Sequence, residues 1–271
     1  YFLNFAESSV VDSQGNELWR KKIAKQVPNV QDGKSILQDS ATKKIIITGY
    51  QYVQGNTSID KILVLDSIGN VLHHTAFIQG FPRDLIQTKD KKMLVAGSTA
   101  HDNGTMIIYR GYAAKFDPEN PFPPMWTSIQ DEPGCNNGYT VVKELANNDL
   151  LFAHWRDSTH IAGQIYVSYL RTNSVGQKTW NRMYNYHIAA STMDFELTSD
   201  GGWVAALAVV QYKPVNPFFF VKYDSTGCDS TLAYCALISA LREMEAPPGI
   251  AYPVPCDDHL IIKNSGSNLT A

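Results

Sequence analysis

Two histidines and an aspartate are the chain's best candidates for metal chemistry. His154, Asp157 and His160 lie close together in the sequence. Imidazole nitrogens and carboxylate oxygens are ligands that zinc uses, so the three side chains could hold Zn²⁺ or another divalent cation. Their spacing does not match the helical HExxH zinc motif. The competing interpretation is that they are ordinary polar residues at a strand end and in a loop.

The other acidic residues lack an evident chemical partner. Asp131-Glu132 and Asp257-Asp258 are adjacent carboxylates, but no nucleophile or metal motif stands beside them. The sequence contains no GxSxG nucleophile motif, no P-loop and no dinucleotide-binding fingerprint. We therefore predict no cofactor and name no catalytic residue. A hydrolase or lyase would have to take its acids from loops, with Asp131 and Asp157 as candidates.

Aromatic residues flank the polar segments that we predict as the variable loops. These loops cover residues 51–60, 98–105, 157–163 and 211–217, and the flanking aromatics are Tyr50, Tyr52, Trp155 and Tyr212. Loops on a rigid scaffold commonly carry binding residues, and such rings could stack on a sugar. Packing in the core or at its rim explains the same residues equally well.

A repeated turn organises the whole chain. The first residue of this turn recurs at Asp12, Asp66, Asp117, Asn173 and Asp224. The period of about fifty residues is the signature of a repeat protein. Four of the five turns also carry a Gly, which adopts the left-handed conformation that such hairpins need, and Trp often opens the next strand. The turn at Asp117 has a longer, proline-rich segment instead.

Four predicted strands make up each repeat. The second strand is the most apolar, as in residues 45–49 and 93–97, and is typical of a strand that is buried on both faces. Meanders of four strands predict an all-β fold, a β-propeller with four-stranded antiparallel blades. The predicted blades cover about 30–78, 80–130, 137–185 and 190–230, after a partial blade at 1–25 that supplies two strands.

The partial blade leaves three arrangements open. It could close a five-bladed ring by completing the last blade, or the chain could be an incomplete part of a larger ring, or the blades could form an open stack. Because the sequence enters a strand directly after Tyr1, we favour the larger ring. Residues 231–249 are predicted to be a linker, since they end in Pro247-Pro248-Gly249, and residues 250–271 are predicted to begin a separate β segment.

Composition limits the classes of partner. The formal net charge is -3, so we expect no nucleic-acid partner, and no apolar run approaches the roughly 20 residues of a transmembrane helix. The chain has four cysteines, of which Cys228 and Cys235 are the predicted disulfide pair. Cys135 and Cys256 stay unassigned, and four free thiols are the alternative.

The tail carries a short motif, Tyr252-Pro253-Val254-Pro255, followed by Asp257-Asp258 and an apolar strand at 260–263. It resembles the start of the C-terminal sorting domain of type IX secretion cargo in Bacteroidetes, although Val254 replaces the usual Asn. Asp200-Gly201-Gly202 precedes a predicted second strand, and Lys222-Tyr223-Asp224 ends a predicted third strand. Both patterns resemble those of secreted propeller-like repeat proteins of the same bacteria. The resemblance implies a secreted or outer-surface location, and recognition of the C-terminal segment by the type IX machinery.

These observations give three functional hypotheses. The first is a secreted or cell-surface, non-catalytic β-propeller that binds a protein or glycan partner at its loop face. The second is a hydrolase or lyase that acts on extracellular polysaccharide. The third is a structural subunit of a surface assembly, in which blade edges pair between copies.

Overall fold

Strands with apolar residues on both faces must be covered on both sides, and the chain meets this requirement by stacking its sheets. A computed structural model describes residues 2–4, 7–11, 14–22, 27, 32–53, 57–102, 107–130, 135–158, 165–184, 190–209, 218–229, 250–253 and 260–263. Within these residues the fold is all-β, with sequential antiparallel sheets consistent with propeller blades. No helix in this part of the chain is long and apolar enough to cross a membrane.

Within the described part of the chain, six sheets follow one another in sequence order. The first contains β1 (Phe2–Asn4), β2 (Glu7–Val11) and β3 (Glu17–Lys21). The next contain β4 (Asp32–Gln38), β5 (Ile45–Val53), β6 (Thr57–Leu65) and β7 (Val71–Gln79), then β8 (Phe81–Gln87), β9 (Met93–Asp102), β10 (Ile107–Phe116) and β11 (Trp126–Ile129). They are followed by β12 (Cys135–Glu144), β13 (Leu150–Ser158), β14 (Ile165–Thr172) and β15 (Lys178–Tyr184). The last two sheets contain β16 (Ala190–Leu197), β17 (Trp203–Val209) and β18 (Phe218–Tyr223), then β19 (Ile250–Pro253) and β20 (Leu260–Lys263).

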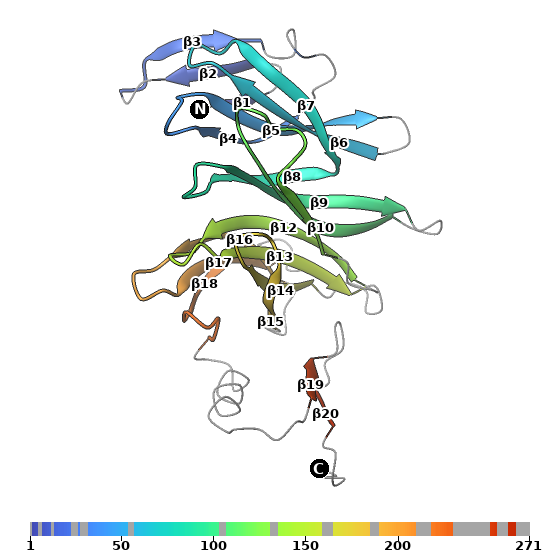
Figure 1. Ribbon diagram of the computed structural model, residues 1–271. Helices are drawn as coiled ribbons and strands as arrows, with labels where there is room; N and C mark the ends of the chain where they lie inside the picture. Colours follow the sequence, from blue (N-terminus) through green and yellow to red (C-terminus); the bar gives the residue numbers. More distant parts are fainter. Residues whose placement is uncertain are drawn as a thin grey trace.

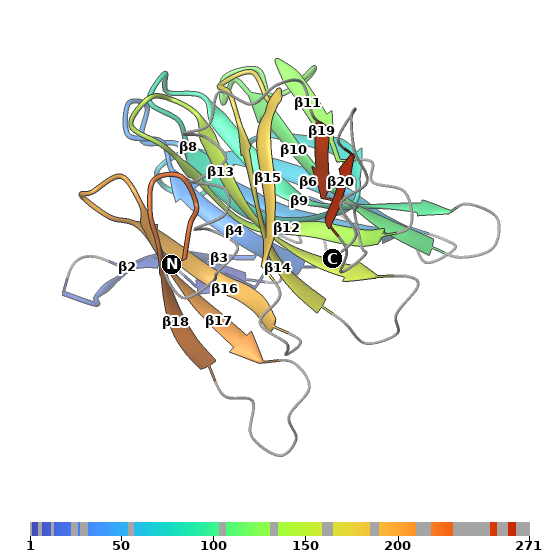
Figure 2. The same ribbon diagram turned by 90° about the horizontal axis from the view of Figure 1, so that it is seen from below.

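The first five sheets lie one against the next. The sheet β1–β3 and the sheet β16–β18 are at opposite ends of the stack (Figure 1), and the strands of successive sheets fan out when seen from below (Figure 2). The described sheets therefore follow one another as successive blades of a propeller do. The division into a repeat domain, a linker and a tail remains a prediction, because residues 230–249 lie outside the described ranges.

Each junction between neighbouring sheets has its own apolar core. Ile45 and Ile47 of β5 pack towards the first sheet, whereas Ile46 packs towards β8–β11. In the same way Leu94 of β9 and Leu151 of β13 face the following sheet. Because successive strand residues point to opposite faces, one apolar run supplies two cores. This confirms the prediction that the second strands are buried on both sides.

Two of the sequence expectations for local structure were wrong. Residues 51–60 and 98–105 were predicted as loops, but Gln51, Tyr52 and Val53 pair with Ile59, Ser58 and Thr57, and β9 continues to Asp102. The polar residues there extend the ladder as a two-stranded ribbon, which β-branched residues such as Thr57 favour. The first sheet also has a third strand, because β1 pairs with β2.

The repeated Trp and the turn Gly contact each other across a junction. Trp19 covers Gly69, and Trp126 covers Gly176, with indole carbons 2.8 and 2.9 Å from the position that a Cβ atom would take. Both glycines have positive φ, at 81° and 80°. At the third such turn, Gly227 lies against Trp203, on which Trp180 stacks at 6.3 Å.

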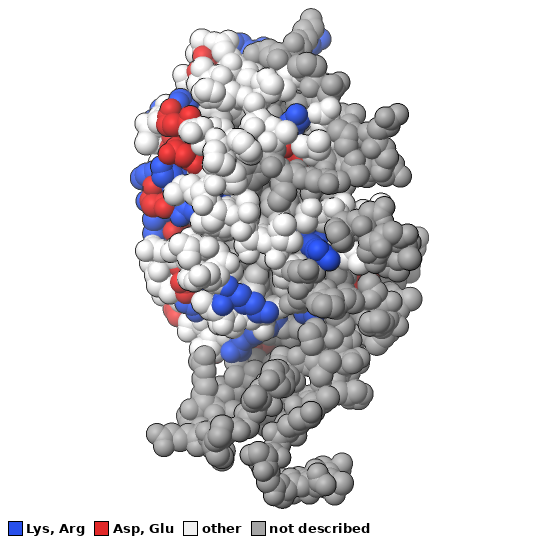
Figure 3. Space-filling view, turned by 45° about the vertical axis from the view of Figure 1, so that its right-hand side comes forward, with Lys and Arg blue, Asp and Glu red and all other residues white. Residues whose placement is uncertain are grey.

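Ion pairs cluster at one end of the sheets. At this end, turns connect the first strand of each sheet to the second, and the third strand to the fourth. We call this the turn end, and charges of both signs line it (Figure 3). The same pair recurs in three sheets, as Lys115–Asp90 at 2.7 Å, Arg171–Asp149 at 2.8 Å and Lys222–Asp200 at 2.9 Å. In each of these sheets, a basic side chain of the third strand forms an ion pair with an aspartate in the turn between the first and second strands.

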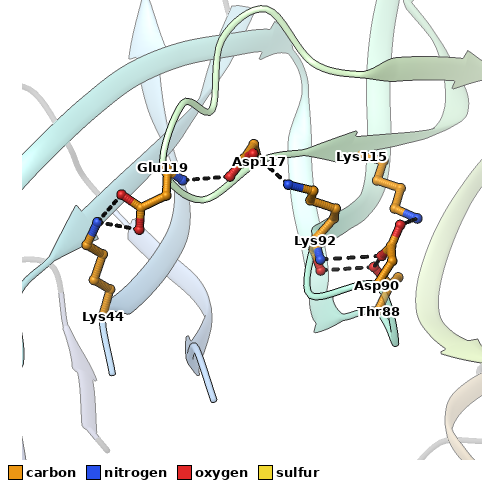
Figure 4. Close-up of polar contacts among 7 residues, drawn as sticks. All are labelled: Lys44, Thr88, Asp90, Lys92, Lys115, Asp117 and Glu119. Atoms are coloured by element: carbon orange, nitrogen blue, oxygen red, sulfur yellow. Dashed lines mark hydrogen bonds and ion pairs between the residues drawn. The ribbon is translucent and has the colours of Figure 1, made fainter. Parts of the chain in front are cut away.

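Further ion pairs connect longer segments at the turn end (Figure 4). Lys92 Nζ lies 2.6 Å from Asp117, and Lys44 of the preceding sheet pairs with Glu119 at 2.5 Å. Most of these pairs are solvent-exposed on at least one side, and such pairs contribute little stability each. These acidic and basic side chains of the turn end are thus paired with one another.

Candidate functional site

Four aromatic side chains form a continuous strip at the other end of the stack, where second strands pass into third strands. They are Tyr50 of β5, Phe81 of β8, Tyr109 of β10 and Trp155 of β13, and we call them the aromatic strip. Successive ring centroids are separated by 5.3, 6.2 and 6.3 Å. The strip crosses three sheets, so the stacking of the sheets creates it.

The strip is partly open to solvent. Phe81, Tyr109 and Trp155 are half-buried, while Tyr50 is 8% exposed and forms the inner end. Lys34 extends over Tyr50, with Nζ 5.3 Å from the ring centroid, a distance at which a cation is attracted to a ring face. The surface therefore offers aromatic rings together with a basic donor, a combination that suits ligands with both apolar faces and hydroxyl groups.

The position of Trp155 depends on a glycine in the innermost strand of its sheet. Trp155 lies opposite Gly138 in the β12–β13 register. Its Nε1 atom is 2.7 Å from the place where a Cβ atom of residue 138 would stand, and Ser98 of the preceding sheet lies 2.9 Å from the same place. The indole can occupy this space because residue 138 has no side chain.

Two asparagines fix Tyr109 and join its strand to the next sheet. Asn136 Oδ1 accepts a hydrogen bond from the Tyr109 amide at 3.0 Å, and Asn137 Oδ1 accepts one from the Gly111 amide at 2.5 Å. β10 pairs with β11 only from Tyr112 onwards, so the asparagine side chains take the place of a strand partner for residues 109 and 111. The strip thus rests on regular, hydrogen-bonded elements.

An acidic group lies at the Trp155 end of the strip. Asp157 is two residues further along β13 and therefore points to the same side as Trp155. Burial raises the pKa of the Asp157 carboxyl above its ordinary value. Its Oδ1 atom has no hydrogen-bond partner among the described residues.

The structure separates the predicted metal ligands. His154 is fully buried, and its Nε2 atom lies 3.2 Å from Asn181 Oδ1. Since His154 and Asp157 are three positions apart on one strand, they point to opposite faces. His160 lies outside the described residues, and no group of three or more metal-binding side chains occurs within them. The metal site therefore remains a sequence prediction.

The predicted aromatic residues have mixed outcomes. Tyr50 and Trp155 lie in the aromatic strip, although they are at its two ends and do not touch one another. The side chain of Tyr52 and the whole of Tyr212 lie outside the described residues. Cys228 Sγ is 3.0 Å from Arg182 Nη1, and Cys235 is outside the described residues, so the disulfide also remains a prediction.

Sequence reasoning did not identify Phe81 and Tyr109 as site residues. Both belong to strands that looked like ordinary repeats, and their meeting with Tyr50 and Trp155 depends on contacts between different sheets. Asp60, which had been placed in a loop, lies in β6. The β-branched residues Thr57, Ile59 and Ile62 are the signal that could have placed it in a strand.

Comparisons with known proteins agree with the fold and assign no activity. No family model matches the sequence, and no curated protein matches it. A Dyadobacter fermentans protein of unknown function is similar in structure, with a TM-score of 0.53 at 10% identity over 73% of this chain; the match spans 61% of that protein.

Two enzymes are more distant in structure. For an endo-arabinase from Bacteroides thetaiotaomicron the TM-score is 0.49 at 11% identity, over 76% of this chain and 80% of the enzyme. For a mannose phosphorylase from Leishmania mexicana it is 0.42 at 11% identity, over 73% of this chain and 65% of the enzyme. At these identities the similarity concerns the fold alone, so any function must be argued from the site.

Proposed function

We propose that this protein is a non-catalytic, secreted or cell-surface scaffold that binds a glycan chain along the aromatic strip. The observation that carries the proposal is the unbroken contact of four aromatic rings across three sheets. Sugar rings have apolar faces that stack on aromatic side chains, and their hydroxyls need nearby polar partners. Lys34 supplies a donor at the Tyr50 end of the strip, and the half-buried Asp157 lies at the Trp155 end.

The rigid mounting of the rings favours binding. Asn136 holds the backbone of Tyr109, and the indole of Trp155 is seated over Gly138, so the Trp155 ring loses little side-chain freedom when a ligand arrives. The sorting-like tail supports an extracellular location, where polysaccharides are available. Recognition of this tail by the type IX machinery is part of the same proposal.

The test is retention of the purified protein on insoluble polysaccharides and on a glycan array. We expect the wild-type protein to bind at least one polysaccharide. Trp155→Ala and Tyr109→Ala should each weaken binding about tenfold or more, as is typical when an aromatic contact residue is truncated. Phe220→Ala is the matched control, because Phe220 is 67% exposed on β18 and lies outside the strip. Failure of the wild-type protein to bind any glycan would overturn the proposal.

The same samples separate binding from catalysis. Release of reducing ends from a bound polysaccharide by the wild-type protein, lost in Asp157→Asn, would favour the hydrolase hypothesis instead. Retention of an intact polysaccharide by both proteins supports a binding role.

A further inference from the structure

Three polar side chains are buried together in an otherwise apolar junction. Thr48 of β5, Asp60 of β6 and Tyr112 of β10 are 1%, 2% and 0% exposed. Thr48 Oγ1, both carboxylate oxygens of Asp60 and Tyr112 Oη have no hydrogen-bond partner among the described residues. Buried polar groups are nearly always satisfied, so an exception calls for a bound ion or water.

The strand register places Thr48 and Asp60 side by side. Tyr50 lies opposite Asp60, and Thr48 lies opposite Ile62. Residues that face each other across strands point to the same side, so Thr48 and Asp60 are diagonal neighbours, roughly 7–8 Å apart between backbones. Ile62, which lies opposite Thr48 and two positions from Asp60, packs in the core shared with β8–β11. This side of the sheet therefore faces the next sheet.

Tyr112 approaches the same place from that next sheet. It belongs to the same core as Ile62. Its Cε1 atom is 3.2 Å from the place where a Cβ atom of Gly80 would stand. Gly80 follows Gln79, which lies opposite Ile59, the residue before Asp60. Two independent registers therefore bring the tyrosine ring to the Asp60 end of the junction.

We propose that Thr48, Asp60 and Tyr112 form an interior binding site for a monovalent hard cation, sodium or potassium. Their ligand atoms are all oxygens, which such cations prefer. One carboxylate balances one positive charge, whereas a divalent ion would leave a net charge in an apolar interior at high cost. Lys61, the next residue in the strand, points to the opposite face and does not neutralise Asp60.

The ionisation of Asp60 is consistent with this assignment. Burial raises the pKa of the Asp60 carboxyl well above its ordinary value of 3.8. A carboxylate without a counter-ion is disfavoured in such surroundings, and a bound cation restores the ionised form. The site borders the aromatic strip at Tyr50, which lies opposite Asp60, but it does not depend on the proposed glycan binding.

The test is thermal unfolding of the purified protein in sodium, potassium or choline chloride at equal ionic strength, near pH 8, where an unshifted carboxyl is ionised. We expect sodium or potassium to raise the Tm of the wild-type protein by about 2–4 °C relative to choline, which is too large to enter the site. Asp60→Asn should abolish this difference. Asp157→Asn, which removes another carboxyl with a raised pKa, should retain it.

Several outcomes would overturn the proposal. One is an equal Tm of the wild-type protein in the three salts, and another is an unchanged salt difference in Asp60→Asn. Stabilisation by calcium without any by sodium or potassium would overturn the monovalent assignment. If Asp60→Asn does not fold, Thr48→Val and Tyr112→Phe serve instead, because each removes one ligand oxygen. An undiminished Tm difference between the salts in both variants would overturn the proposal.

Discussion

The indole of Trp126 lies against Gly176 of the next sheet, with its Cζ3 atom 2.9 Å from where a Cβ atom would stand. Trp19 and Gly69 repeat this relationship two junctions earlier, between the first and second sheets. The junction without such a turn Gly has His73 at the position of the Trp, and there Lys44 pairs with Glu119 of the following turn. The repeated Trp of one sheet and the turn Gly of the next sheet are therefore partners in a single contact between sheets.

Gly176→Ala tests this contact. The substitution places a Cβ atom into the Trp126 ring at a positive φ of 80°, so we expect it to lower the free energy of unfolding by about 2–4 kcal/mol. Gly15→Ala is the matched control, because Gly15 has a φ of 87° and nothing described within 4 Å of its Cβ position. It should lose only about 1 kcal/mol. Chemical denaturation measures both, and equal losses would show that the indole contact is unimportant.

Gly138→Ala is expected to displace Trp155 and to weaken glycan binding without touching a ligand. The new methyl group would stand 2.7 Å from the indole Nε1 atom, so the ring must move. Isothermal titration with a bound oligosaccharide, together with tryptophan emission, reports the effect. In a Trp155→Ala background the same substitution should have little further effect on affinity, as a double-mutant cycle would show. Additive losses would contradict this explanation.

Asp84→Ala should loosen the junction between the innermost strands β8 and β12. Asp84 Oδ2 accepts a hydrogen bond from the Val142 amide at 2.8 Å, and burial raises the pKa of its carboxyl. Loss of the acceptor leaves a backbone donor unsatisfied, which costs about 1–3 kcal/mol. The control is Asp194→Ala at the equivalent position of β16, where the described bond is to the adjacent Phe195 amide. A smaller loss for Asp84→Ala than for Asp194→Ala would contradict the prediction.

The pH dependence of stability should report on Asp60 when choline is the cation. Its pKa is raised in the folded protein, so the folded state holds the proton more tightly than the unfolded state. The stability is therefore greatest below the ordinary pKa and falls as pH rises above about 4, by up to about 1.4 kcal/mol per pH unit until the native pKa is reached. Asp60→Asn should remove this component of the slope. Identical slopes for both proteins, measured by denaturation from pH 4 to pH 8, would be the contrary result.

The sequence predicted the strands and turns well because their signals are local. The apolar second strands and the turn that starts at Asp66 or Asn173 depend on residues close in the chain, and the structure has them at these positions. The extension of β5 to Val53 and the start of β6 at Thr57 escaped notice because polar residues in a two-stranded ribbon resemble a loop. That misreading also concealed Asp60.

Only two of the four residues of the aromatic strip could be predicted from the sequence, for a different reason. Tyr50 and Trp155 stood out because they flank predicted loops, whereas Phe81 and Tyr109 join them only through contacts between sheets. The spacing of residues along one chain does not specify how the face of one sheet meets the next. His154 illustrates the opposite error, because a polar residue near a predicted loop proved to be buried against Tyr139 and Asn181.

The Trp–Gly contacts and the four apolar cores each join adjacent sheets, which has a consequence for how the molecule responds to damage. Cooperativity can pass along the stack only from neighbour to neighbour, as in a linear chain of coupled units. A lesion at one junction should therefore divide the protein into two blocks that melt separately. Limited proteolysis of Gly176→Ala should then release fragments that correspond to whole sheets.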